Sequence, residues 1–288
     1  MAVGDLVTGE WQLEFGGLKI GDGTGYDLRL IDGLGGMAGV TTGDKRLLDR
    51  HGMTAGTDYL TGRQIAIELD VMDTDHAVRA TLIDALNRAF RPGQAEQALV
   101  FQIPSIAGGG KRRVLCRVRD RSLAVGLAHL YALSEISLLL QATGPRIFDD
   151  TETSADTTLV TTSGGRTYPL TFPRTYAAVA AGGTIAANNT GTFGTPVVLR
   201  IDGPCQNPQI TNGTSGSVLG LTITIADGDF IELDSENRTV LLNGTASRYQ
   251  FLTSSEWFDL EPGTTDLEFR AATATAATLT ATFRSAWS

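Results

Sequence analysis

The chain has 288 residues, a net charge of −9 and a hydrophobic fraction of 42%. That hydrophobic fraction excludes an intrinsically disordered chain, and the acidic balance argues against a general nucleic-acid-binding protein. The 34 glycines follow no three-residue period, which excludes collagen, and they predict many turns between short strands. The length allows two domains, each with a core of its own.

Neither targeting nor redox motifs stand out. Cys116 and Cys205 lie far apart and form no C-x-x-C pair, so we expect neither a disulfide framework nor a zinc motif. The first residues lack a basic segment followed by an apolar one, and the longest apolar stretch, 123–133, is too short to span a bilayer. We therefore expect a soluble protein without membrane insertion.

The first part of the chain predicts strands around one helix. Between 64 and 71, apolar residues alternate with polar ones, which is the pattern of a half-buried strand. A helix is predicted over about 74–90, because 73–75 offers an N-cap, an apolar stripe begins at Val78, and Arg91-Pro92-Gly93 ends it. Further strands are expected near 113–119 and 132–140. This order predicts an α+β domain over 1–148, a mostly antiparallel β-sandwich with one helix.

Cationic residues recur at every second position of one predicted strand. Five of the six odd-numbered residues from 111 to 121 are basic, namely Lys111, Arg113, Arg117, Arg119 and Arg121. A period of two places them on one face of the strand. This face is either solvated, with cross-strand partners such as Glu68 and Asp70, or it is a subunit contact or an anion-facing surface.

The second part of the chain predicts strands only. A polar, acidic run indicates a linker over 149–165. Beyond it, turn residues recur every 8–12 residues or so without a helical period, and 27 threonines lie among residues 151–288. We therefore expect an all-β domain over 166–288, a sandwich of the jelly-roll or galectin-like type. The fold class as a whole is mainly β.

Motifs for catalysis or cofactor binding are weak. The three histidines (His51, His76 and His129) are not at metal-ligand spacing. The aspartates at 227, 229 and 234 could bind calcium, but turn chemistry accounts for them. We expect no enzyme, no cofactor and no metal.

Nine short segments occur in an order that covers most of the chain. They are 26–34, 59–67, 86–92, 141–148, 201–203, 208–210, 234–244, 257–263 and 283–287. In this order and spacing the chain resembles the distal tail proteins of long-tailed, siphovirus-type bacteriophages, or a neighbouring minor tail protein. It departs from many members at Gly144-Pro145, where they carry an Asp-Pro pair, and at 264–266, where they carry an Asn-containing turn.

The resemblance implies a structural component of the virion tail tip, made in the bacterial host cytoplasm. It implies a homo-oligomeric ring, usually a hexamer, that joins the tail tube protein to the hub or tail-fibre protein. DNA would pass through the ring without sequence-specific binding. The N-terminal domain would build the ring and the C-terminal domain would project outward. Since closed rings need head-to-tail interfaces, the residues expected at subunit contacts are Tyr59, Arg63, Arg113, Arg117 and Arg119.

An alternative is a carbohydrate-binding module that contacts the host surface through the C-terminal domain. Aromatic side chains beside polar loops stack on sugars, so Trp257, Phe258 and Trp287 are the candidate sugar contacts, with burial in a core as the competing interpretation. A polysaccharide-degrading enzyme is a further rival. It would need two facing carboxylates, which the sequence does not reveal.

Overall fold

The computed structural model describes residues 2–93, 95–159, 183–274 and 277–288. The chain divides into two compact units, Met1–Asp150 with Trp287–Ser288 (the N-terminal unit) and Thr151–Ala286 (the C-terminal unit). One correction concerns the predicted linker over 149–165, because Thr153–Thr158 forms strand β13 and pairs with another strand. Residues 160–165 of that segment lie outside the described residues.

The N-terminal unit is built on an antiparallel sheet with the strand order β2-β1-β9-β10-β11-β8-β3, while β12 pairs with β10 and β27. The strands are β1 Gln12–Phe15, β2 Leu18–Gly21, β3 Asp27–Asp32, β8 Arg63–Met72, β9 Gln97–Gln102, β10 Lys111–Leu123, β11 Leu133–Ala142, β12 Ile147–Asp149 and β27 Ala286–Trp287. The long strand β10 pairs with different strands along its length: residues 111–116 pair with β9, and residues 117–123 pair with β11. The sheet therefore bends along β10.

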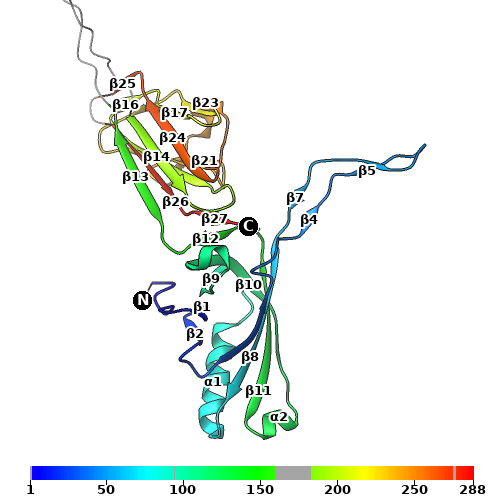
Figure 1. The fold of residues 1–288 in the computed structure, drawn as a ribbon. Helices are drawn as coiled ribbons and strands as arrows, with labels where there is room; N and C mark the ends of the chain where they lie inside the picture. Colours follow the sequence, from blue (N-terminus) through cyan, green and yellow to red (C-terminus); the bar gives the residue numbers. More distant parts are fainter. Residues whose placement is uncertain (1, 94, 160–182, 275–276) are drawn as a thin grey trace, which may run out of the picture. The chain divides into compact units, whose positions relative to one another are not determined.

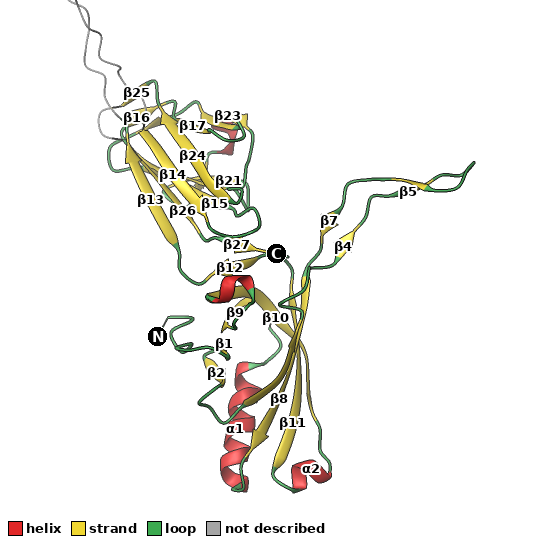
Figure 2. Cartoon of the chain, viewed as in Figure 1, coloured by secondary structure: helices red, strands yellow, loops and turns green. Residues whose placement is uncertain are grey.

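The core of this unit follows the predicted strand alternation. On β8, Ile65, Ile67, Leu69 and Val71 have no exposed surface, and the residues between them point away from the core. Helix α1, His76–Ala89, packs on the buried side of the sheet, as Figure 2 shows. After its last turn, Phe90 stacks on Phe15 with ring centroids 4.8 Å apart. The helix thus covers the sheet, as the sequence predicted.

The buried face of α1 differs from the predicted stripe in its first turn. Val78 is 44% exposed, whereas Arg79 is 3% exposed. The Arg79 guanidinium donates to the carbonyl oxygens of Asp73 at 2.7 Å and His129 at 3.3 Å. These carbonyls compensate for the loss of water around a buried cation. A second, short helix that the sequence did not predict, α2, spans Leu127–Leu130.

A two-stranded arm projects from the N-terminal unit between β3 and β8 (Figure 1). Its strands are β4 Val40–Thr41, β5 Lys45–Arg46, β6 Met53–Thr54 and β7 Tyr59–Leu60, with β4 paired to β7 and β5 to β6. Large apolar side chains on the arm face solvent, among them Leu48 at 98% and Met53 at 63% exposure. An isolated hairpin of this kind is marginally stable in water.

The C-terminal unit is an antiparallel β-sandwich, as the sequence predicted. One sheet has the order β13-β26-β15-β20-β21-β22 and the other β14-β24-β17-β18-β23, with a small third sheet β19-β16-β25. The strands are β13 Thr153–Thr158, β14 Gly183–Asn189, β15 Val197–Asp202, β16 Cys205–Gln206, β17 Gln209–Asn212, β18 Val218–Leu221, β19 Thr224–Ile225, β20 Phe230–Asp234, β21 Thr239–Leu242, β22 Ala246–Ser247, β23 Leu252–Ser255, β24 Gly263–Arg270, β25 Thr273–Ala274 and β26 Thr278–Phe283. The mainly β fold class is thereby confirmed. Within the described ranges, no helix has the length and apolar character needed to cross a bilayer.

We predict that neither cysteine reacts with iodoacetamide at pH 8 in the native protein. Cys116 and Cys205 are both buried and lie in different units. Burial raises the pKa of the Cys116 thiol to about 12 and that of Cys205 to about 11, so the reactive thiolate is absent at pH 8. Mass spectrometry should find both thiols alkylated after denaturation in urea. Rapid alkylation of the native chain would contradict the burial of the reacting thiol.

Candidate functional site

The basic residues of β10 do not all share one face. As predicted, the side chains at 111, 113, 115 and 117 alternate with the buried residues at 112, 114, 116 and 118. A register shift between Val118 and Asp120 then makes Arg119 the extra residue of a β-bulge. Because one inserted residue reverses the alternation, Arg121 turns toward the helix, and its Nη1 donates to the carbonyl oxygens of Asn87 and Phe90.

The ion-pair partners of this face differ from those predicted. Arg113 pairs with Asp150 at 2.6 Å, and Lys111 lies 3.7 Å from the same carboxylate. Glu68 and Asp70 are on β8, which β11 separates from β10. The charge of Arg113 is therefore balanced inside its own unit, which weakens its candidacy as a subunit contact.

Arg117 and Arg119 stay available at the edge of the sheet. Arg119 is exposed, and Arg117 is partly buried. Among the described residues, the buried Nε atom of Arg117 has no hydrogen-bond acceptor. From 117 onward β10 pairs with β11, whereas the register with β9 ends at Cys116. These two cations thus stand beside a stretch of open strand edge.

Arg63 is a structural residue and not a surface contact, which corrects the prediction for it. Arg63 is buried, with only 2% of its surface exposed. The guanidinium donates from Nη1 to the carbonyl oxygens of Gly33, at 2.9 Å, and Gly36, and from Nη2 to that of Pro145 at 3.2 Å. Tyr59, by contrast, lies on the arm and is 68% exposed, so it keeps its candidacy.

Replacing Arg63 by lysine is expected to lower the free energy of unfolding by about 2 kcal/mol, because an ammonium group cannot reach all these carbonyl oxygens at once. Denaturant unfolding followed by circular dichroism measures the effect. Arg46→Lys, on the exposed arm, is the matched control and should change the stability by less than about 0.5 kcal/mol. Equal stability of the two variants would contradict the bracing role of Arg63.

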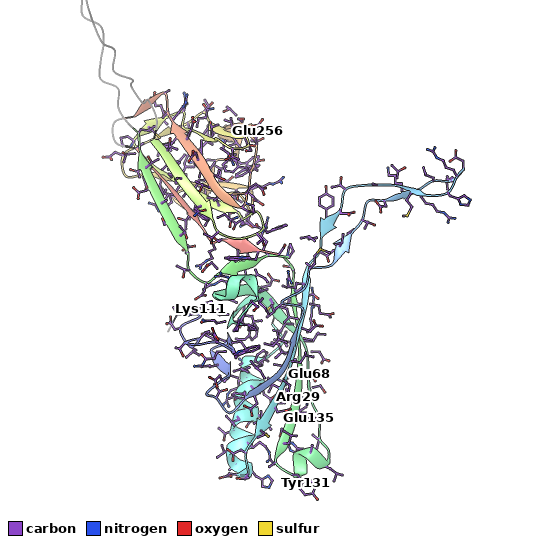
Figure 3. All side chains as sticks on the ribbon, viewed as in Figure 1. Arg29, Glu68, Lys111, Tyr131, Glu135 and Glu256 are labelled. Atoms are coloured by element: carbon purple, nitrogen blue, oxygen red, sulfur yellow. The ribbon has the colours of Figure 1, made fainter. Side chains whose placement is uncertain are left out.

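The opposite edge of the same sheet carries acidic groups. On β3, Asp27 and Asp32 are exposed, and β3 is the terminal strand in the sheet order. Beside them, Arg29 lies 3.5 Å from Asp70 and 3.4 Å from Glu135. Figure 3 shows Arg29, Glu68 and Glu135 close together on this side of the unit. One sheet edge is therefore acidic and the other is basic.

The three aromatic residues predicted to contact sugar do not come together. Trp287 belongs to the N-terminal unit, is 7% exposed and packs in the core of that unit. The guanidinium of Arg112 lies 3.8 Å from its ring centroid and pairs with Asp149 at 2.7 Å. Trp287 is thus a core residue, and its predicted sugar contact is wrong for this structure. Trp257 and Phe258 lie in the C-terminal unit.

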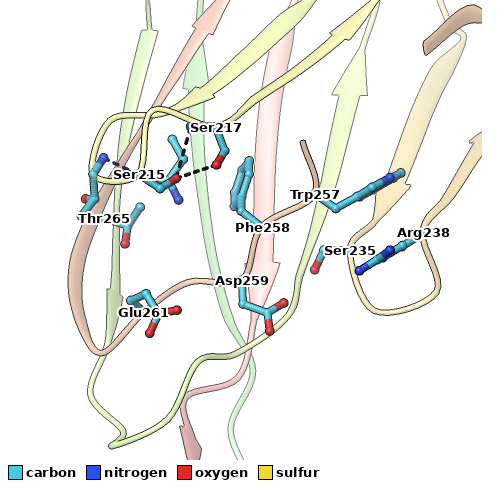
Figure 4. Close-up of a pocket in the computed structure, with 11 residues that line it drawn as sticks. Ser215, Ser217, Ser235, Arg238, Trp257, Phe258, Asp259, Glu261 and Thr265 are labelled. Atoms are coloured by element: carbon cyan, nitrogen blue, oxygen red, sulfur yellow. Dashed lines mark hydrogen bonds between the residues drawn. The ribbon is translucent and has the colours of Figure 1, made fainter. Parts of the chain in front are cut away.

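A pocket of about 360 Å³ in the C-terminal unit includes Trp257 and Phe258. We call it the C-terminal pocket, and three segments line it: 212–217, 235–238 and 257–265. Figure 4 shows hydroxyl groups from Ser215 and Ser217 on one side of Phe258, with Trp257 and Arg238 on the other. Asp259 and Glu261 also line it. Across the described ranges, no cluster of three or more His, Cys, Asp or Glu side chains is arranged to hold a metal ion.

These features define a mainly β protein of two units, with an extended arm and two sheet edges of opposite charge. Residues 190–287 match the family model for the siphovirus-type tail component, C-terminal domain. The predicted resemblance to siphophage distal tail proteins is thereby confirmed. No curated protein matches the chain in sequence.

Solved structures extend the similarity to the whole fold. The crystal structure of SPP1 Dit, described as a paradigm of the hub adsorption apparatus in phages that infect Gram-positive bacteria, superposes with a TM-score of 0.65 at 15% identity. The alignment covers 96% of this chain and 98% of SPP1 Dit. The phage P2 baseplate in its activated conformation with calcium gives 0.46 at 10% identity, covering 90% and 91%. The chain therefore has the SPP1 Dit fold.

Proposed function

We propose that this chain is a non-enzymatic structural component of a siphophage tail tip and that copies of it form a closed ring. The observation that carries the proposal is the pair of open edges on one sheet. At one edge lies β3, and at the other lies the 117–123 half of β10. An open edge can pair with a strand of a neighbouring chain, and head-to-tail pairing of unlike edges closes into a ring.

Charge supports the same arrangement. Arg117 and Arg119 flank one edge, and Asp27 and Asp32 lie on the other. A basic edge facing an acidic edge steers two copies into head-to-tail contact, whereas two like edges repel each other. Self-complementarity of this kind needs no other protein.

The arm supplies a second contact. Its exposed apolar residues, including Leu48, Met53 and Tyr59, have little of their own chain to pack against on a two-stranded hairpin. We infer that each arm lies on a neighbouring copy, where these side chains become buried. The exposed position of Tyr59 favours its predicted role at a subunit contact.

The ring would hold six copies and would join the tail tube protein to the hub or tail-fibre protein, with DNA passing through its centre. The similarity to SPP1 Dit, which is described as a paradigm of hub adsorption apparatus, supports this placement in the virion. Mass photometry of the purified full chain should give six times the 30.5 kDa of one chain. A strict monomer at concentrations of about 100 µM would overturn the proposal, since ring interfaces of standard size are far tighter.

A second candidate function is contact with a saccharide through the C-terminal unit. The observation that favours it is the C-terminal pocket, which combines two aromatic residues with hydroxyl and carboxylate groups. Its volume is within the range of small-molecule sites. A glycan array probed with the labelled full chain tests this function, and the absence of binding to every glycan would contradict it.

A further inference from the structure

We propose that the C-terminal pocket binds a neutral or amino-substituted pyranose sugar and rejects acidic sugars. The inference rests on the proposed saccharide function and assigns the class of sugar. It is independent of ring formation, which involves the N-terminal unit.

The lining of the pocket suits a ring of carbon atoms that carries hydroxyl groups. Trp257, which is partly buried, supplies apolar surface for the C–H face of a sugar, and Phe258 packs in the core of the unit beside it. Ser215 and Ser217 supply hydroxyl groups, which both donate and accept hydrogen bonds, as sugar hydroxyls do. Carboxylates add strong acceptors.

Hydrogen bonds hold the walls in place before any ligand arrives. Asn212, 3% exposed, accepts from the backbone N–H groups of Thr214 at 2.9 Å and Ser215 at 3.0 Å. The hydroxyl of Ser215 lies 3.0 Å from that of Ser217. On the opposite wall, the Ser235 hydroxyl accepts from the N–H of Val197 at 2.8 Å. Because the loops are already ordered, binding carries a smaller entropic cost.

The charge of the pocket selects among sugars. Asp259 and Glu261 contribute two negative charges, and Arg238 contributes the single positive charge of the lining. The sum is therefore negative at neutral pH. A carboxylate on the sugar would be repelled, while an ammonium group would be attracted. Arg238 and Glu261 are both exposed, whereas Asp259 is partly buried, so the charged lining residue that is least exposed to water is acidic.

Saturation-transfer NMR of the full chain with glucose, glucosamine and glucuronate tests the inference, because these sugars share a pyranose ring and differ in charge. We expect binding of glucose and glucosamine with dissociation constants of about 1 mM, and signals at least about fivefold weaker for glucuronate. Glu261→Gln and Asp259→Asn should each lower the preference for glucosamine over glucose. Neither change removes a buried apolar group.

Asp227→Asn is the matched control, since it removes one negative charge from an exposed turn of the same unit outside the pocket lining. If it shifts the sugar preference as much as Glu261→Gln does, the pocket is not the site. Equal binding of all three sugars would overturn the inference while leaving the saccharide function intact. If none of the three sugars binds, both the sugar-class inference and the saccharide function are overturned. Ring formation is tested separately, by the mass of the assembled particle.

Discussion

Replacing Trp287 by alanine is expected to lower the free energy of unfolding of the N-terminal unit by about 3 kcal/mol or more. The indole is 7% exposed and packs in the hydrophobic core of this unit. Its loss leaves a cavity and takes the aromatic face from Arg112, which is itself 9% exposed. The Arg112–Asp149 pair would then border a void, where an ion pair is poorly solvated.

Trp11→Ala is the control, because Trp11 lies in the same unit and is 56% exposed. Its stability change should stay within about 0.5 kcal/mol. Hydrogen exchange of amides in β9 and β10 measures the N-terminal unit without depending on tryptophan fluorescence, which both variants alter. Equal protection in both variants would show that Trp287 does not contribute to this core.

The regular elements were predictable because their signal is local. The period of two on β8 placed Ile65 and Ile67 in the core, and both have no exposed surface. The predicted helix differs from the observed one mainly in its first turn. There the sequence pattern favoured Val78, and distant carbonyl oxygens made Arg79 the buried residue. Sequence periodicity does not contain that information.

The cationic face of β10 shows where local patterns stop being informative. Alternation predicts its outward residues correctly up to Arg117. The bulge at Arg119 depends on pairing with β11, so a sequence pattern within β10 alone does not locate it. Likewise, Arg113 pairs with Asp150 across 37 positions of the chain. Long-range pairs of this kind decide which charges remain available.

The C-terminal pocket has the same limitation. The sequence singled out Trp257 and Phe258 as aromatics, but not Arg238 or Ser215. Those residues come from connections that the sandwich brings together across the fold. Trp287 was grouped with the other aromatics for its residue type alone, and the structure places it in the other unit.

Reversing both charges at Arg117 and Arg119 to glutamate is expected to abolish ring formation. Each interface of the proposed ring would lose two attractive contacts and gain two repulsive ones. At roughly 1 kcal/mol for each of these four contacts, the dissociation constant of one interface rises roughly 1000-fold. A ring that must close through every interface then dissociates to monomers at micromolar concentration, which sedimentation velocity measures at that concentration.

Two further variants separate a specific contact from a general effect of charge. Arg248→Glu with Arg270→Glu changes the net charge by the same amount in the C-terminal unit and should leave the ring intact. Adding Asp27→Arg and Asp32→Arg to the Arg117/Arg119 variant exchanges the sign of both edges and should restore assembly in part, since attraction returns with opposite polarity. An intact ring in the Arg117/Arg119 variant would show that this face is merely solvated. Loss of the ring without restoration would place the partner of Arg117 and Arg119 somewhere other than β3.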